Sequence, residues 1–457
     1  MSKKQIHFNG FVQNSPSPYS SGLWKHEKDI GENHVDLNYW INLAQTLEKG
    51  KFDSIFIADV LGTYNVYNNS YDTAAKYAVQ LPSHDPTAVI SAMAAATNHI
   101  GFTPTISTTY SQPYSLARQL STLDHLTNGR IGWNVVTSYL ETEAQNLGLK
   151  KRLSKEERYK RADEFLNVSY KLWEYSWDED AVVKDTNSDT YSEPSKVHSI
   201  NHLEEYFDIS GPHLVEPSIQ RTPVLFQAGA SKRGKAFAAK HAEAVFTKHR
   251  SLDALKDYIS EIEAKATEYG RNKEDILVFP MVLPIIGATE AEAHEKHEKL
   301  KEYVSYEGVA TLLSGHTGID LSSIDPDAYI EDIKTDAIQV DLDHYAQDPN
   351  HKWTFREAIK NHAIGNGAVK FIGTKEQVAD QFQQWAVEGG AAGFNITQSY
   401  GIGTFEELID EVIPVLQRRG LYRTEYDGQT LRENLYGKGH SRIKDTHLAK
   451  NKGNFII

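Results

Sequence analysis

The stretch PVLFQAGASKRG, residues 223–234, contains the pattern on which the fold prediction rests. Its apolar first half predicts a buried β-strand over residues 223–229. The small residues at its centre allow the chain to turn, and the residues after them open a helix. A strand that leads directly into a helix is the repeating unit of parallel α/β proteins.

The same strand-then-helix order recurs along nearly the whole chain. Seven further apolar runs predict strands, at Ile6–Val12, Ser54–Val60, Ile100–Thr108, Arg130–Thr137, Ala244–Lys248, Ile276–Ile286 and Ala392–Gln398. A doubly wound open sheet also alternates strands with helices, but eight units in a row favour closure. We therefore predict an α/β protein, a (β/α)8 TIM barrel.

Helix start signals lie between the predicted strands. In a capping box, a hydroxyl residue and an acidic or amide residue three positions later satisfy free backbone donors. This pattern predicts four helix starts, at Ser154 with Glu157, Thr289 with Glu292, Thr374 with Gln377 and Thr404 with Glu407. Asp85 before Pro86 predicts a further start. Pro414 is expected to kink the last helix.

Three stretches exceed a minimal barrel and predict insertions, at about residues 61–84, 176–222 and 303–373. The first follows a strand, so we expect it to rise from the face where barrel active sites form and to act as a lid or substrate wall. We predict one barrel domain over residues 1–420. Residues 421–457 are expected to form an extended C-terminal arm that packs against the barrel or a second subunit.

Composition excludes several classes of function. The 457 residues contain no cysteine, which removes disulfides, thiolate metal sites and cysteine nucleophiles. The formal net charge of −14 argues against a nucleic-acid partner. The apolar stretches are too short to span a membrane, and the first residues lack an apolar signal core. We expect a cytoplasmic protein with a small-molecule substrate.

Polar residues stand where predicted strands end, which is where barrel enzymes place their functional groups. Asp59 ends the second strand, as either a cofactor contact or a buried partner of an arginine. The turn Gln227–Gly234 could hold a phosphate with its backbone N–H groups and the dipole of the following helix, although many such turns bind nothing. The chain has no Gly-x-Gly-x-x-Gly unit, so no dinucleotide site is predicted. His294 and His297 lie in a charged helical stretch, and we predict no metal site there.

A series of segments in a fixed order carries a family resemblance. They include Asp36–Trp40, Leu47–Asp53, Ser121–Thr127, Gly129–Ser138, Gln220–Val224 and Gln417–Arg423. Together they resemble the nitrilotriacetate monooxygenase branch of the bacterial-luciferase-like flavin monooxygenases, almost from end to end. Pro194–His198 and Gly437–Gly439 further resemble the long-chain alkane monooxygenases of this branch.

The resemblance implies a barrel that binds reduced FMN (FMNH2), with O2 as co-substrate and a separate NAD(P)H-dependent flavin reductase as partner. By position, the residues expected to line the isoalloxazine and ribityl part are Asp59, Ser107, Asn134 and Thr137. Those expected to hold the phosphate are Tyr159, Gly229, Ala230 and Ser231. Many relatives have a hydroxyl residue where Ala230 stands, so free flavin is expected to bind less tightly here.

The implied activity inserts one oxygen atom from O2 into a small organic substrate through a flavin C4a-peroxide. The substrate predicted first is a carboxylated organosulfur compound, with a long-chain alkane or an aminopolycarboxylate as the alternatives. Where the alkane enzymes have a cysteine and several histidines around their pocket, this chain has Ser15, Pro18, Tyr139 and Leu312, which argues against an alkane.

The candidate catalytic residues are His316, Tyr139, Tyr64 and Gln80, with Tyr139 or His316 as the proton donor. A structural role for His316 in the loop Gly-His-Thr-Gly is the competing interpretation. Two functions of other classes stay open, a metal-dependent barrel hydrolase and a flavin-binding protein without turnover. A homodimer or homotetramer is expected.

Overall fold

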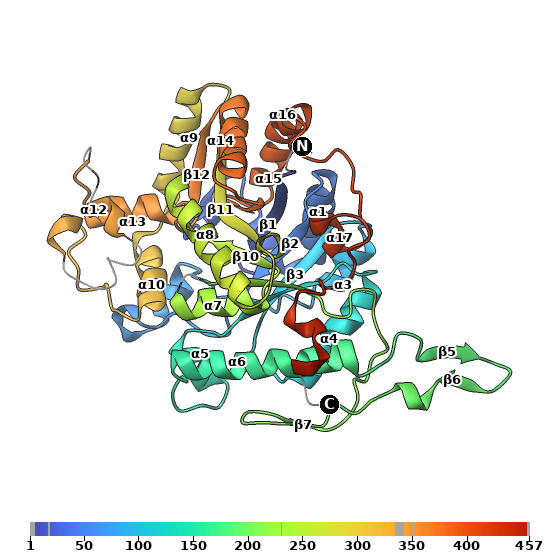
Figure 1. Cartoon of the computed structure of the whole chain (residues 1–457). Helices are drawn as coiled ribbons and strands as arrows, with labels where there is room; N and C mark the ends of the chain where they lie inside the picture. Colours follow the sequence, from blue (N-terminus) through green and yellow to red (C-terminus); the bar gives the residue numbers. More distant parts are fainter. Residues whose placement is uncertain are drawn as a thin grey trace.

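The computed structural model describes residues 5–16, 19–229, 231–333, 342–346, 348 and 351–454. A barrel of eight parallel strands lies at its centre (Figure 1). The barrel strands are β1 (His7–Gln13), β2 (Ser54–Ala58), β3 (Gly101–Ser107), β4 (Gly132–Val136), β9 (Val224–Ala228), β10 (Ala244–Thr247), β11 (Leu277–Ile286) and β13 (Gly393–Thr397). The predicted (β/α)8 TIM barrel is thus confirmed, and each barrel strand coincides with one of the eight predicted runs.

Pairing between β10 and β11 closes the barrel. Ala244 of β10 pairs with Leu277 of β11, and β1 pairs with β13 on one side and with β2 on the other. All neighbouring barrel strands run parallel. Their carboxyl ends therefore meet at one face, and this mouth gathers the residues that follow the strands.

Aromatic side chains fill the barrel interior. The ring centroids of Phe11 and Phe56 lie 5.2 Å apart, those of Phe56 and Phe226 5.7 Å, and those of Phe226 and Phe279 6.2 Å. The four rings come from β1, β2, β9 and β11, so they join opposite sides of the barrel. Because this interior is a packed core, a ligand site is expected at the mouth.

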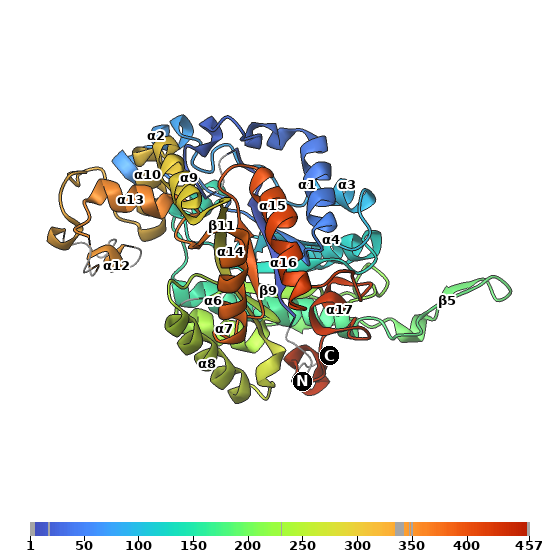
Figure 2. The same cartoon turned by 90° about the horizontal axis from the view of Figure 1, so that it is seen from above.

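Helices cover the outside of the barrel (Figure 2). They are α1 (Leu37–Lys49), α3 (Ile90–Ala95), α4 (Pro113–Leu126), α5 (Glu141–Asn146), α6 (Lys155–Tyr170), α7 (Lys232–His241), α8 (Leu252–Glu268), α9 (Glu290–Tyr303), α14 (Lys375–Val387), α15 (Gly403–Glu407) and α16 (Ile413–Arg418). The predicted capping boxes at Ser154 and Thr374 are present, and the Thr289 hydroxyl accepts from the Glu292 amide. Within the described ranges, no helix is long and apolar enough to cross a membrane.

The stretches predicted as insertions contain secondary structure of their own. Residues 61–84 include α2 (Asp72–Lys76), and residues 176–222 include the hairpins β5–β6 (Val182–Asp185, Thr190–Ser192) and β7–β8 (His202–Leu203, Asp208–Ile209). The β5–β6 hairpin projects far from the barrel (Figures 1 and 2). Residues 303–373 include α10 (Tyr306–Thr317), α12 (Asp343–Ala346), α13 (Phe355–Ala363) and β12 (Val369–Gly373).

Strand β12 was not predicted. It lies outside the closed ring and pairs with Val282–Ile286, the second half of β11. The first half of β11 pairs with β10 inside the ring, so this long strand belongs first to the barrel and then to the insertion. The β12 sequence VKFIG contains Lys370 and is only partly buried, so it lacks the continuous apolar run by which the barrel strands were predicted.

Two predicted helix starts were wrong. Helix α3 begins at Ile90 instead of Pro86, because the Asp85 side chain accepts from the Thr87 amide and forms a turn. Thr404 lies inside α15 and its hydroxyl accepts from the Ser399 amide instead of capping the helix. A π-helical segment, Leu408–Val412, joins α15 to α16 immediately before Pro414, where the missing proline N–H interrupts the regular ladder.

The C-terminal arm packs against the barrel through buried ion pairs. Arg432, in α17 (Leu431–Tyr436), forms a bidentate pair with Glu243 at 2.7 and 2.9 Å. The side chains of Arg432 and Glu243 are 1% and 4% exposed. Arg423 similarly pairs with buried Asp53 at 2.7 Å. The arm is thus fixed by charges that have no access to water.

Replacing Arg432 by alanine is expected to lower the free energy of unfolding by about 3–5 kcal/mol, because the buried Glu243 carboxylate would lose its counter-charge. Urea unfolding measures this difference. Arg442→Ala is the matched control, since its ion pair with Glu179 is largely exposed and such pairs contribute about 1 kcal/mol or less. Equal losses in both variants would contradict the expectation.

Candidate active site

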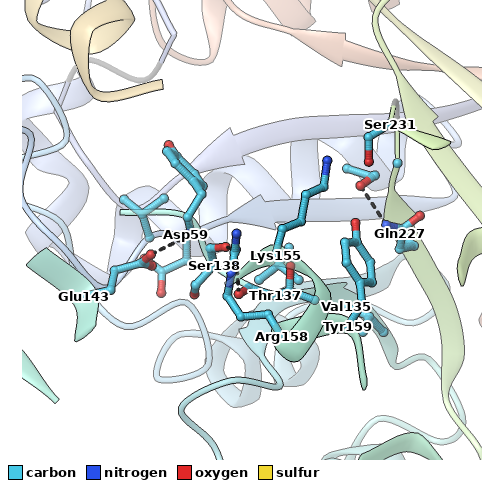
Figure 3. A pocket seen from close by; sticks show the side chains of 15 residues that line it. Asp59, Val135, Thr137, Ser138, Glu143, Lys155, Arg158, Tyr159, Gln227 and Ser231 are labelled. Atoms are coloured by element: carbon cyan, nitrogen blue, oxygen red, sulfur yellow. Dashed lines mark hydrogen bonds between the residues drawn. The ribbon is translucent and has the colours of Figure 1, made fainter. Parts of the chain in front are cut away.

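A cavity of about 420 Å³ opens at the carboxyl ends of β2, β4 and β9 (Figure 3). Its size lies within the range of roughly 300–1,000 Å³ that is usual for small-molecule and cofactor sites. The lining residues are Asp59, Val60, Val135, Val136, Thr137, Ser138, Tyr139, Glu143, Lys155, Arg158, Tyr159, Gln227, Ala228, Gly229 and Ser231. Six of the residues expected in the site from sequence are among them: Asp59, Thr137, Tyr139, Tyr159, Gly229 and Ser231.

A second cavity of about 210 Å³ lies beside the first and shares Asp59 and Ser138 with it. It is lined by Ser107, whose hydroxyl accepts a 2.9 Å hydrogen bond from the Ser138 hydroxyl. Ser138 adopts the left-handed conformation at φ 59°, a strained geometry for a residue other than glycine. The end of β4 therefore turns so that it contributes to both cavities.

The turn between β9 and α7 forms a cradle at one end of the main cavity. Ser231 caps α7 by accepting from the Gly234 amide, so the free N–H groups of this helix start lie beside the cavity. The Tyr159 hydroxyl hydrogen-bonds with Ser231 and Thr137, and the Tyr258 hydroxyl donates to the Gly229 carbonyl at 2.8 Å. Ala230 lies outside the described residues.

The two glycines of this turn leave the space that a phosphate would need. A Cβ on Gly229 would lie 2.7 Å from both the Gln227 Oε1 and the Gly234 carbonyl oxygen. A Cβ on Gly234 would lie 3.0 Å from the Tyr159 hydroxyl and 3.2 Å from the Ser231 Oγ. Any side chain at either position would displace the groups around the cradle. The donor set and the available space fit the phosphate of FMN.

Two buried amide oxygens also fit a polar heterocycle such as the flavin ring. The Asn134 side chain donates to Thr105 at 2.8 Å, while its Oδ1 has no hydrogen-bond partner among the described residues. The Gln227 Oε1 likewise lacks a partner within the described ranges. A buried acceptor without a donor costs about 1–3 kcal/mol, so N–H groups of a bound ligand would recover this energy.

The sequence patterns did not predict Lys155 and Arg158 as site residues. Both lie in the first turns of α6 and line the main cavity (Figure 3). Arg158 donates to the carbonyl oxygens of Thr137 and Ser138, and its Nε has no partner among the described residues. Since α6 belongs to the unit that follows β4, its N-terminal turn faces the mouth, and a basic residue in that turn was the signal that could have identified them.

A tyrosine pair forms one wall of the site. The hydroxyl groups of Tyr64 and Tyr139 lie 2.5 Å apart, and the Tyr64 hydroxyl donates to the Gln80 Oε1 at 3.2 Å. Gln80 adopts φ 49°, so its position is maintained by a strained backbone. The three residues come from the first insertion and from the end of β4. The structure thus brings together three of the four predicted catalytic residues.

His316, the fourth, packs against both tyrosines. Its ring centroid lies 6.0 Å from that of Tyr64 and 5.7 Å from that of Tyr139, with the rings edge-to-face. Burial lowers the pKa of His316 to about 3, assisted by the charge of Lys248. The imidazole is therefore neutral at physiological pH and cannot act as a cationic acid.

The segment around His316 is helical, so the expectation of a loop was wrong. His316 lies in the last turn of α10, which ends at Gly318 in the left-handed conformation at φ 77°. A Cβ on Gly315 would lie 2.2 Å from the Tyr64 ring, so this glycine lets the ring rest on the helix. Leu312 belongs to the same apolar cluster as Tyr64. Ser15 is buried, and Pro18 lies outside the described residues.

Asp59 lies between the two cavities, and no described arginine or lysine forms an ion pair with it. Burial, together with the nearby charges of Asp85 and Glu143, raises its pKa from an ordinary 3.8 to about 7. The folded state therefore favours the neutral carboxyl. Its contribution to stability is fully present below about pH 4 and is lost as the pH rises through 7.

Replacing Asp59 by asparagine is expected to raise the thermal midpoint of the flavin-free protein by a few degrees above about pH 7, and to leave it unchanged near pH 4. The reason is that the amide carries no charge to bury. Thermal unfolding across this pH range tests the prediction. Parallel curves for the two proteins would show that the pKa of Asp59 is not raised.

The histidine pair of α9 does not converge on one point. His294 is exposed, whereas His297 is buried against the neighbouring elements. A different group, Glu164, His202 and Glu204, has metal-ligand geometry. The Glu164 carboxylate, however, already accepts from the amides of Tyr206 and Phe207. These contacts explain Glu164 as a structural group that anchors the second insertion.

The sequence pattern of the luciferase-like monooxygenases matches residues 15–393. The chain belongs to this family and is a flavin-dependent monooxygenase. It is 47% identical over 446 residues to long-chain alkane monooxygenase of Geobacillus thermodenitrificans (strain NG80-2), covering 98% of this chain and 97% of that protein. It is 42% identical over 448 residues to dimethyl-sulfide monooxygenase of Hyphomicrobium sulfonivorans (98% and 93% covered). Nitrilotriacetate monooxygenase component A of Aminobacter aminovorans is 36% identical over 441 residues (94% and 96% covered).

Solved structures agree with this assignment. The crystal structure of DmoA from Hyphomicrobium sulfonivorans superposes with a TM-score of 0.94 at 40% identity, covering 99% of this chain and 97% of that one. Long-chain alkane monooxygenase gives 0.89 at 46% identity (98% and 99% covered). Riboflavin lyase, solved with modified FMN and riboflavin, gives 0.90 at 33% identity (99% and 100% covered). The predicted family and branch are confirmed.

Proposed function

We propose that this protein is the oxygenase of a two-component system and uses FMNH2 and O2 to oxidise a small organic substrate. The observation that carries the proposal is the cradle of Gly229, Ser231 and Tyr159, together with the unpartnered buried amide oxygens on β4 (Asn134) and β9 (Gln227). In the overall reaction FMNH2, O2 and substrate give FMN, water and a product with one added oxygen atom. These atoms and electrons balance without a further reductant.

Each part of the flavin has candidate partners in the site. The helix start at Ser231, the Tyr159 hydroxyl and the cations Lys155 and Arg158 would hold the phosphate. Asp59, Ser107, Asn134 and Thr137 would line the isoalloxazine and ribityl part. When bound, reduced FMN supplies the two electrons that activate O2, by way of the C4a-peroxide that we include in this proposal.

Tyr139 is the proton donor in this proposal. The Tyr64 hydroxyl has one proton, and it donates that proton to Gln80, so the 2.5 Å bond uses the proton of Tyr139. When Tyr139 gives its proton to an oxygen atom of the reacting molecule, Tyr64 can turn its own proton toward the Tyr139 oxygen. Burial raises the pKa of Tyr139, whereas a hydrogen bond donated by Tyr64 to the Tyr139 oxygen lowers it, and this is the bond that forms once Tyr64 has turned its proton.

His316 has a different role from that of a cationic acid. A neutral imidazole offers one N–H donor and one acceptor nitrogen. Packed edge-on against both tyrosine rings, it excludes water from the Tyr139 hydroxyl and orients the substrate beside it.

The partner in this proposal is an NAD(P)H-dependent flavin reductase that releases FMNH2. The name of one relative, nitrilotriacetate monooxygenase component A, supports a system of more than one component. The absence of a Gly-x-Gly-x-x-Gly unit from the sequence agrees with this. We also propose a homodimer or homotetramer located in the cytoplasm, with residues 1–420 as the barrel domain and residues 421–457 as its C-terminal arm.

A carboxylated organosulfur compound is the proposed substrate. Relatives of similar identity are named for an alkane, for dimethyl sulfide and for nitrilotriacetate, so family membership leaves the substrate open. Tyr139 and Leu312 stand where the alkane enzymes have polar pocket residues, and this supports a substrate other than an alkane.

Anaerobic titration of the purified protein with FMNH2, followed by rapid mixing with O2-saturated buffer, tests the proposal. We expect tight binding of reduced flavin and a transient absorbance that differs from that of oxidised FMN. Binding without such a transient would favour a flavin-binding protein without turnover. No binding would sink the proposal and direct attention to metal analysis and the hydrolase alternative.

A further inference from the structure

Two cations follow β10 at the mouth of the barrel. Ala244 and Phe246 of this strand belong to the interior core, and the Phe246 ring stacks on Phe11 with centroids 4.9 Å apart. Since side chains alternate along an extended chain, Lys248 continues the inward-facing row just beyond the end of the strand. Both Lys248 and Arg250 are exposed, so a molecule that arrives from solvent at this end of the barrel can contact them.

Lys248 lies close to the tyrosine wall of the site. Its Nζ donates to the Asn366 carbonyl oxygen at 3.0 Å, which holds the side chain between β10 and the second half of the third insertion. Besides burial, the charge of Lys248 is what lowers the pKa of His316. His316 packs against Tyr139, which lines the main cavity. A group bound by Lys248 would therefore lie next to the reacting end of the site.

His362 and Lys370 are two further basic residues on this side of the barrel. His362 is 3% exposed, and neither of its ring nitrogens has a hydrogen-bond partner among the described residues. Burial and the surrounding groups Arg250, Lys248, Lys370 and His316 hold its pKa well below the usual value. Lys370 on β12 forms no ion pair with any described residue, and burial with the charges of Arg250 and Lys301 lowers its pKa to about 8. The groups that shift these pKa values are all basic.

The opposite side of the mouth is acidic. Asp85 and Glu143 lie around the second cavity, and their negative charges help to raise the pKa of their neighbour Asp59. Once the phosphate of FMN is bound to Lys155 and Arg158, an anionic substrate would be repelled by Asp85 and Glu143 and drawn toward the β10 side. The mouth thus has negative charges on one side and positive charges on the other, and this arrangement orients a molecule with one charged end.

We propose that Lys248 and Arg250 bind a carboxylate of the substrate and direct its oxidisable end toward Tyr139. This inference rests on the proposed function, and it assigns the substrate to the small organic acids. An ammonium group has three N–H donors, so Lys248 can bind a carboxylate in addition to contacts that it already makes, such as the one with Asn366. The arginine guanidinium adds planar, two-point recognition of the same group.

Titration calorimetry of the flavin-free, full-length protein tests this inference with 3-(methylthio)propanoate and its neutral primary amide as probes. We expect the wild-type protein to bind the acid at least about tenfold more tightly than the amide, a factor typical of one charge-assisted hydrogen bond. Lys248→Gln is expected to reduce this preference to about twofold, and Arg250→Gln to reduce it partly. Lys256→Gln, on the exposed surface of α8, is the matched control and should keep the full preference.

Three results would overturn the inference: no binding of the acid, equal binding of acid and amide, or an unchanged preference in Lys248→Gln. An anaerobic titration of the same proteins with FMNH2 separates this failure from failure of the proposed function. If wild-type protein and Lys248→Gln bind FMNH2 equally but show no carboxylate preference, only the inference falls. If the wild-type protein does not bind FMNH2, the proposed function falls whatever the probes do.

Discussion

Replacing Tyr139 by phenylalanine is expected to lower kcat about 10²–10⁴-fold, the usual contribution of a positioned proton donor or acceptor. The phenyl ring preserves the packing against His316, whereas the hydroxyl that bonds to Tyr64 is lost. Oxygen consumption should continue, with the missing product replaced by released H2O2. Measuring product and H2O2 in parallel at saturating substrate distinguishes this outcome from a loss of flavin binding.

Variants of Tyr64 and Gln80 should change kcat and its pH dependence less than the Tyr139 variant does. In Tyr64→Phe the Tyr139 anion loses the bond that lowers its pKa, so we expect a smaller loss of kcat, about tenfold, and a shift of the pH profile toward higher pH. Gln80→Leu frees the Tyr64 proton for Tyr139 and should move the profile the other way. Tyr191→Phe, on the projecting hairpin, is the control. If Tyr139→Phe matched Tyr191→Phe in product yield, Tyr139 would not be the donor.

The barrel was predictable from sequence because a parallel strand buried on both faces is a continuous apolar run. Each barrel strand lies within its predicted range or departs from it by one residue. β1, for example, was predicted at Ile6–Val12 and observed at His7–Gln13. Such runs depend only on local composition, and eight of them in order leave few topologies.

The errors lie where a distant or competing contact decides the local structure. The Thr404 hydroxyl could cap a helix, but it instead binds the amide of Ser399. The Asp85 side chain forms a turn with Thr87 before the helix begins. The five residues of β12 form a strand only because the end of β11 offers them an unpaired edge. The first two contacts are local alternatives to the expected caps, and the third depends on a strand that is distant in sequence.

The phosphate cradle of the site could be predicted from the sequence pattern, whereas the tyrosine wall could not. Ser231 and Gly229 follow from the strand–turn–helix pattern, since their function depends on backbone near the turn. The family resemblance alone predicted Tyr64, Gln80 and His316. Tyr64 and His316 are 252 positions apart in the sequence, and only packing in the folded chain brings them together. The neutral state of His316 depends on burial, which sequence does not give residue by residue.

Replacing Gly229 by alanine is expected to weaken the binding of reduced FMN at least about 30-fold. The added Cβ would lie 2.7 Å from the Gly234 carbonyl oxygen and 2.8 Å from its carbon, which is backbone and cannot move without shifting the start of α7. The N–H groups of that helix start would then miss the phosphate. Losing two charge-assisted hydrogen bonds of about 1.5–3 kcal/mol each removes about 3 kcal/mol or more, which exceeds the roughly 2 kcal/mol that a 30-fold loss requires.

Anaerobic titration with FMNH2 measures the effect, and titration with reduced riboflavin, which lacks the phosphate, identifies its source. Gly229→Ala should bind riboflavin about as well as the wild-type protein does, because only the phosphate cradle is displaced. Gly211→Ala is the matched control, since a Cβ there meets no atom within 4 Å. If both ligands weakened equally in Gly229→Ala, the turn would contact the ring instead of the phosphate. If neither weakened, the phosphate would bind elsewhere, and the positive charges of Lys155 and Arg158 would then be the groups to replace.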